Sequence, residues 1–120
     1  MNSEQFVEIL NENVRDSVLR IVTSDLENAD TKYKKLVDLS TWYNSKDEVE
    51  KQLITDLITR VYDCAAFRFL CMLDGVAFRT ESGACYELYH ISKDGKVSLI
   101  DNKNSDELHD LYVADFKKQI

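Results

Sequence analysis

Apolar residues in the first third of the chain recur every three or four positions, which is the spacing of one face of an α-helix. Between residues 4 and 22 this apolar stripe is formed by Val7, Leu10, Val14, Val18 and Ile21. Asn2 or Ser3 can cap the helix, because a side-chain oxygen before the first turn accepts a bond from a free backbone N–H. After a polar stretch from residue 23, we expect a second helix from about Thr31 to Tyr43, with inward side chains at Tyr33, Leu36, Val37, Leu39 and Trp42.

The third segment carries the strongest helical signal. The sequence SKDE at residues 45–48 has the form of a capping box, in which Ser45 and Glu48 bond each other's backbone N–H. Apolar residues then keep helical spacing from Val49 to Leu73, and Asp74-Gly75 ends the pattern. We expect this to be the central helix of the fold, with its apolar end at residues 64–73 buried on several sides.

From Val76 the apolar period changes to two, which is typical of β-strands. The candidate strands are VAFR (76–79), ACYELYHI (84–91) and KVSLID (96–101), and Lys93-Asp94-Gly95 predicts a hairpin turn. A last helix over residues 106–119 can be capped by Asn104 or Ser105. The pattern predicts one α+β domain over residues 1–120, with three N-terminal helices, a three-stranded antiparallel β-meander and one C-terminal helix.

Composition narrows the class of protein. A formal net charge of −7 and a pI near 4.8 disfavour direct binding to nucleic acid or to an anionic membrane, and favour a basic protein as partner. The first ten residues lack the features of a signal peptide, and no stretch is long and apolar enough to span a membrane. The three cysteines are an odd number, so we expect reduced thiols and a cytoplasmic location.

No pattern in the sequence indicates catalysis, and we expect no enzyme activity. Cys64 and Cys71 lie in the most apolar part of the central helix, so we expect both to be small core residues. Cys85 is the most exposed candidate, but no pattern in the sequence brings a base to it, and His90 fits a structural role.

Metal and cofactor motifs are absent from the sequence as well. The cysteines and histidines lack close chelate spacing. The stretch DNKNSDE (101–107) resembles a calcium loop, but it lacks the glycine at position six and the glutamate at position twelve. We therefore expect neither a metal ion nor a cofactor.

The acidic residues follow a more informative pattern. Glu4, Glu8, Glu12 and Asp16 stand four residues apart, so on a helix they form one ridge of like charge, which costs a few tenths of a kcal/mol per pair. A solvated helix face is one explanation. Carboxylates are favoured in the first turns of a helix, and Arg15 and Arg20 can pair with Glu12 and Asp16.

The net charge is confined to the two ends of the chain. Residues 1–30 sum to −5, residues 31–100 are neutral and residues 101–120 sum to −2. Chain ends are often close together, and neighbouring terminal helices would then form one acidic surface. The candidate partner-binding residues are Glu4, Glu8, Glu12, Asp16, Asp106, Glu107 and Asp110.

The second half of the chain, with FLCMLDGV (69–76), ELYHISKDGKVSLIDN (87–102) and LHDLYV (108–113), resembles small acidic immunity proteins of bacterial toxin systems. The resemblance implies a non-catalytic inhibitor that covers a basic surface or active site of a cognate toxin. It assigns no residue a role, because such proteins share an inhibitory task rather than a fold.

Two other functions fit the same sequence. One is an inhibitor encoded by a phage or mobile element that mimics DNA and binds a host nucleic-acid enzyme. The other is a small oligomerisation module, in which the stripe from Val7 to Ile21 pairs between chains as a short coiled coil. The sequence leaves the oligomeric state open.

Overall fold

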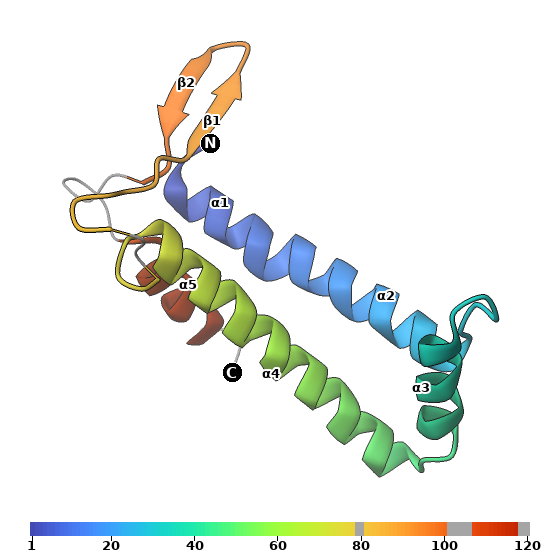
Figure 1. The fold of residues 1–120 in the computed structure, drawn as a ribbon. Coiled ribbons are helices and arrows are strands. Elements are labelled where there is room, and N and C mark those ends of the chain that lie inside the picture. The colour runs from blue at the N-terminus through green and yellow to red at the C-terminus, as the bar shows by residue number, and fades with distance from the viewer. Residues whose placement is uncertain (79–80, 101–106, 118–120) are drawn as a thin grey trace. The chain divides into compact units, whose positions relative to one another are not determined.

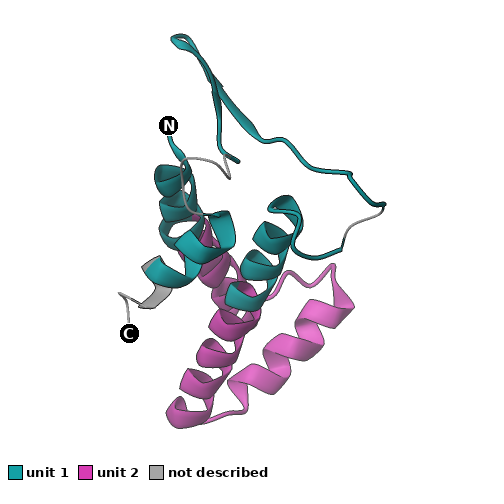
Figure 2. Ribbon diagram, turned by 90° about the vertical axis from the view of Figure 1, so that its left-hand side faces the viewer, with its two compact units in different colours: residues 1–13, 63–120 teal, residues 14–62 magenta. Residues whose placement is uncertain are grey.

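The computed structural model describes residues 1–78, 81–100 and 107–117. It confirms the α+β class (Figure 1). The chain forms two compact units (Figure 2). Unit 1 comprises Met1–Asn13 and Asp63–Ile120, and unit 2 comprises Val14–Tyr62. Within the described ranges, no helix is long and apolar enough to cross a membrane.

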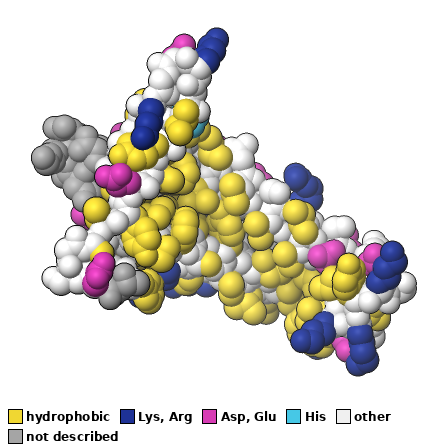
Figure 3. Space-filling model, turned by 45° about the horizontal axis from the view of Figure 1, so that its top comes forward, with side chains coloured by type: hydrophobic (Ala, Val, Ile, Leu, Met, Phe, Trp, Pro, Cys, Tyr) yellow, Lys and Arg dark blue, Asp and Glu magenta, His cyan; other side chains and the backbone are white. Residues whose placement is uncertain are grey.

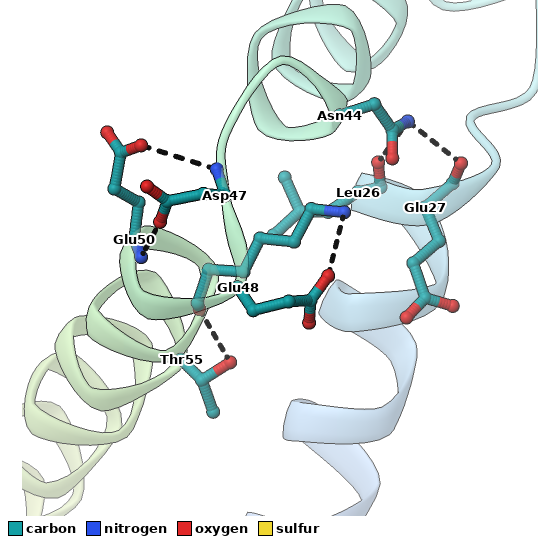
Figure 4. A network of polar contacts seen from close by, with 8 residues as sticks. Leu26, Glu27, Asn44, Asp47, Glu48, Glu50 and Thr55 are labelled. Carbon is teal, nitrogen blue, oxygen red and sulfur yellow. Dashed lines mark hydrogen bonds and ion pairs between the residues drawn. The ribbon is translucent and has the colours of Figure 1, made fainter.

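Unit 2 contains α2 (Arg15–Glu27), α3 (Lys34–Asn44) and the first part of α4 (Glu48–Leu73). Helices α2 and α3 pack against each other. The Asn44 side chain fixes this contact, because its Nδ2 donates to the carbonyl oxygens of Leu26 at 3.4 Å and Glu27 at 3.1 Å (Figure 4). The last carbonyls of α2 thereby gain donors that the helix itself cannot supply.

The inward face of α3 differs from the predicted one. Ser40 and Tyr43 are its buried residues, whereas Tyr33, Leu39 and Trp42 are about half exposed, so their predicted inward positions are wrong. Trp42 lies instead beneath the ammonium group of Lys46, 5.3 Å from the ring centre, where a cation–π contact partly covers it.

The central helix begins with a capping box, as expected, but with different residues. Asp47 Oδ1 accepts the Glu50 N–H at 2.8 Å, and Glu50 Oε1 accepts the Asp47 N–H at 3.3 Å (Figure 4). The predicted Ser45–Glu48 box is wrong because Ser45 serves the preceding helix. Its hydroxyl donates to the Trp42 carbonyl at 2.6 Å, at the C-terminus of α3.

Unit 1 contains α1 (Ser3–Ile9), most of the π-helical turn η1 (Leu10–Val14), the end of α4, the strands β1 (Tyr89–Ser92) and β2 (Gly95–Ser98), and α5 (Leu108–Lys117). The predicted cap at Asn2 is confirmed, with Gln5 completing a capping box. Ser3 takes another role: its hydroxyl donates to the Leu99 carbonyl at 2.8 Å. The buried apolar residues of this unit are Val7, Ala66, Leu70, Cys71, Leu99, Leu108 and Tyr112.

Helix α4 ends where the sequence predicts, at Asp74-Gly75, in a Schellman motif. Gly75 has a φ of 76° and donates its N–H to the Met72 carbonyl, while the Val76 N–H bonds the Cys71 carbonyl. Val76 is therefore part of the helix cap. The predicted strand at 76–79 is wrong over its described residues 76–78, which form no ladder.

The predicted hairpin is confirmed, although its strands are shorter than expected. β1 and β2 pair antiparallel in the register Tyr89 to Ser98, and Gly95 has a φ of 131° at the turn. The sheet within the described residues has two strands, not three. The predicted caps Asn104 and Ser105 lie outside the described residues, as do residues 101–106 of the stretch that resembles a calcium loop.

Candidate functional site

The two units differ sharply in charge. Unit 1 holds thirteen Asp and Glu residues against seven Lys and Arg, whereas unit 2 holds nine against eight. Unit 1 therefore carries −6 of the net −7, and unit 2 is close to neutral. This division brings the acidic first residues and the acidic last residues of the chain into one unit.

Three of the predicted partner-binding residues lie at the start of unit 1. Glu4 and Glu8 on α1 and Glu12 in η1 are exposed. No Lys, Arg or His among the described residues of unit 1 forms an ion pair with them. Because η1 is a wider turn than an α-helical one, Glu12 does not continue the row of Glu4 and Glu8 at regular α-helical spacing. The expected single ridge is therefore interrupted.

The terminal helices are neighbours, which is the condition for one acidic surface, because α1 contacts α5. Asp110 on α5 is exposed, and Glu107 immediately before this helix is partly buried. Asp106 lies outside the described residues, and Asp16 belongs to unit 2. Within unit 2, Asp16 and Arg20 form no ion pair, so the expected neutralisation of Asp16 is absent there.

A buried carboxylate holds the first turn of α5. Asp74, whose side chain is 1% exposed, accepts the backbone N–H groups of Leu108 at 3.2 Å and His109 at 2.9 Å. The His109 ring nitrogen Nδ1 lies 2.6 Å from Asp74 Oδ2. The end of α4 thus caps α5 from 34 residues away along the chain. No local sequence pattern indicates this cap.

Three carboxylates lie close to the ring of His109. Besides Asp74, Glu107 Oε2 lies 3.4 Å from Nδ1, and Asp110 Oδ1 lies 3.5 Å from Nε2. Phe67 on α4 packs edge-on against the ring, with 5.8 Å between ring centres. Glu107 and Asp110 are therefore engaged with the imidazole, in contrast to the carboxylates of α1.

The same cluster is the best candidate for a metal site among the described residues. Ligand atoms of Asp74, Glu107 and His109 all lie within 4.8 Å of one another. Neighbouring ligands of an octahedral ion with bonds of about 2.1 Å would be about 3.0 Å apart. The 2.6 Å separation of Asp74 and His109 is instead that of a hydrogen bond, and both Asp74 oxygens already accept backbone N–H groups. The arrangement is a hydrogen-bonded helix cap.

A second buried polar contact joins α4 and α5. The Tyr112 hydroxyl donates to Asp63 Oδ1 at 2.7 Å, and both residues are buried. Asp63 stands in a long apolar stretch, which is the one sequence signal that could have marked it as a buried, partnered carboxylate.

The three cysteines differ in burial. Burial raises the pKa of the Cys71 thiol above 9.0; Arg68 lowers it, and Asp74, Asp110 and Glu107 raise it further. Cys71 is therefore a core thiol, as predicted. Cys64 is exposed, so its predicted core position is wrong, because it occupies an outward position on α4. Cys85 is exposed, as expected.

The sequence matches no protein-family model, and comparisons with curated proteins and with solved structures gave no significant match. The candidate site therefore rests on the residues of this chain alone.

Proposed function

We propose that the chain is a non-catalytic protein-binding inhibitor that covers a basic surface or active site of its partner, in the manner of a toxin-immunity protein. The observation that carries this proposal is the net charge of −6 in unit 1, where the terminal helices α1 and α5 are in contact. We call the exposed carboxylates of Glu4, Glu8, Glu12 and Asp110 the terminal acidic surface.

The carboxylates of α1 and η1 are the best suited to meet a partner. They are exposed and bear no ion pair within the described part of unit 1, so a basic partner displaces water and counterions rather than an internal cation. On a basic nuclease, such carboxylates would occupy positions that substrate phosphates otherwise fill. Charge complementarity of this kind accelerates association and weakens steeply with salt.

The experiment compares two charge-reversed variants of equal net charge. One carries Glu4→Lys, Glu8→Lys and Glu12→Lys in unit 1. The control carries Glu27→Lys, Asp30→Lys and Asp38→Lys, all exposed residues of unit 2. Each immobilised protein is incubated with extract of its native cell at low salt, and captured proteins are identified and purified for assay.

We expect the wild type and the unit 2 variant to capture the same basic protein. The wild type should inhibit the activity of that protein. Its association with the unit 1 variant should be about tenfold slower at low salt, or slower still. Equal binding of the two variants, or a captured protein whose activity is unaffected, contradicts the proposal. A captured toxin supports the immunity type, whereas a captured host nucleic-acid enzyme supports the alternative of a phage-encoded inhibitor.

A further inference from the structure

Helix α4 exposes a row of large apolar side chains within unit 2. Val49, Leu53, Leu57 and Val61 are 72%, 62%, 62% and 60% exposed. They stand four residues apart and extend along about 18 Å of helix, and we call them the α4 stripe. Figure 3 shows that exposed hydrophobic side chains are present on the surface turned to the viewer. Continuous apolar rows of this kind on a soluble protein mark interaction sites.

The residues that precede each member of the stripe form a parallel row of polar side chains. Glu48, Gln52, Asp56 and Arg60 are all exposed. This polar row begins with an acid and ends with a base, because Glu48 lies in the first turn of α4 and Arg60 lies twelve residues later. Within one chain, the Gln52 amide donates to Asp56 at 3.0 Å.

We propose that the α4 stripe binds the α4 stripe of a second copy of this chain, in antiparallel orientation about a two-fold axis near Ile54. Rows of residues spaced by four are the ridges that interdigitate when two helices pack at about −50°. With the axis at this position, the stripe of one copy lies between the stripe residues of the other. The interface is isologous, as in most symmetric dimers.

The polar row favours an antiparallel orientation of the two helices and a second copy of this chain as the partner. About this axis Glu48 lies opposite the partner's Arg60, and Gln52 lies opposite the partner's Asp56. The two-fold axis repeats each pair, so the charges of the row are complementary to themselves. In a parallel pair the polar rows of the two copies would lie on opposite sides of the interface, so Glu48 and Arg60 would not face each other and the complementarity would be unused.

The contact is short, so we expect a reversible dimer with a Kd in the micromolar range. It is independent of the terminal acidic surface, because the stripe lies in unit 2 and that surface in unit 1. A result that contradicts the dimer therefore does not contradict the proposed partner binding by the terminal acidic surface, and the reverse also holds.

The first experiment is sedimentation equilibrium of the full chain from about 1 μM to about 300 μM. The wild type is expected to pass from monomer to dimer, and the Leu53→Glu/Leu57→Glu variant to stay monomeric. The control is Ile91→Glu/Val97→Glu, which places the same charges on exposed apolar residues of the hairpin in unit 1 and should dimerise as the wild type does. A monomeric wild type, or a dimer that survives the α4 change, overturns the proposal.

The second experiment exchanges the charges of the polar row. Glu48→Arg and Arg60→Glu should each weaken dimerisation about fivefold to thirtyfold, because each creates two like-charge pairs. The double variant Glu48→Arg/Arg60→Glu restores opposite charges and should dimerise as the wild type does. In a parallel dimer the two polar rows would lie on opposite sides of the interface, so neither single variant would weaken dimerisation. Single variants that dimerise as the wild type does, or a double variant as weak as the single ones, therefore overturn the antiparallel arrangement.

Discussion

The Tyr112 hydroxyl and the Asp63 carboxylate are joined by a 2.7 Å hydrogen bond in the interior of unit 1. They are 49 residues apart and lie on α5 and α4. A buried carboxylate is costly without donors, so this bond stabilises Asp63 and fixes α5 at one rotation against α4. The contact holds one of the two terminal helices in place.

Replacing Tyr112 by Phe should lower the free energy of unfolding by about 1–3 kcal/mol, because a buried carboxylate loses a donor while the packed ring is kept. Denaturant unfolding of the two proteins measures the difference. Tyr89→Phe is the matched control, since Tyr89 is an exposed residue that also donates to a carboxylate, that of Glu87. Equal stability of wild type and Tyr112→Phe would show that the bond contributes nothing.

Replacing Asp74 by Ala should lower stability by about 2–3 kcal/mol, since three charge-assisted contacts at the start of α5 are lost. The loss should be local at first: amide hydrogen exchange should speed up in α5 more than in α4. Asp94→Ala in the exposed hairpin turn is the control and should change neither quantity. Unchanged exchange in α5 would refute the capping role.

A metal chelator should leave the melting temperature of the protein unchanged. Asp74, Glu107 and His109 are within reach of a common ion, but the shortest contact between them is a hydrogen bond rather than a ligand-to-ligand distance. Thermal unfolding with and without EDTA, after purification without added metals, measures this. A fall in melting temperature on chelation would show that an ion occupies the cluster.

Sequence patterns correctly predicted several features that depend only on residues close together in the chain. The Asn2 cap, the end of α4 at Asp74-Gly75 and the hairpin turn at Gly95 each follow from residues within a few positions of one another. That the terminal helices are neighbours was an assumption based on a general tendency of domains, and the α1–α5 contact supports it. The assumption did not follow from any contact that the sequence shows.

Contacts distant in sequence account for what could not be predicted. Asp74 caps a helix that begins 34 residues later, and Asp63 bonds a tyrosine 49 residues later; neither spacing has a sequence signature. The α4 stripe has the spacing of a core helix. Periodicity shows that such a face is apolar but not that a neighbouring helix covers it.

The two candidate capping residues before α4 can be distinguished by mutation. Asp47→Ala should cost about 1 kcal/mol, because Asp47 accepts the Glu50 N–H at the helix start. Ser45→Ala should leave the first turn of α4 intact, since its hydroxyl bonds the end of α3. Hydrogen exchange of the first α4 amides separates the two effects. If the first α4 amides exchanged faster in Ser45→Ala than in Asp47→Ala, the result would support the Ser45–Glu48 capping box predicted from sequence.

The three thiols should differ in reactivity, because burial raises the pKa of Cys71 while Cys64 and Cys85 are exposed. Titration of the native protein with a thiol reagent near pH 8 should show two fast groups and one slow group. Cys71→Ala should remove the slow group, and Cys64→Ala one of the fast ones. Equal rates for all three thiols would contradict the buried position of Cys71.

The raised pKa of Cys71 also predicts how stability depends on pH. The folded protein holds the thiol proton to higher pH than the unfolded chain, which ionises near 9.0. The unfolded state therefore binds fewer protons above that pH, so the contribution of Cys71 is complete below 9.0 and is lost as pH rises beyond it. Unfolding free energies of wild type and Cys71→Ala, measured from pH 7 to about 10.5, should accordingly converge above 9.0. A constant difference across this range would show that the thiol ionises alike in both states.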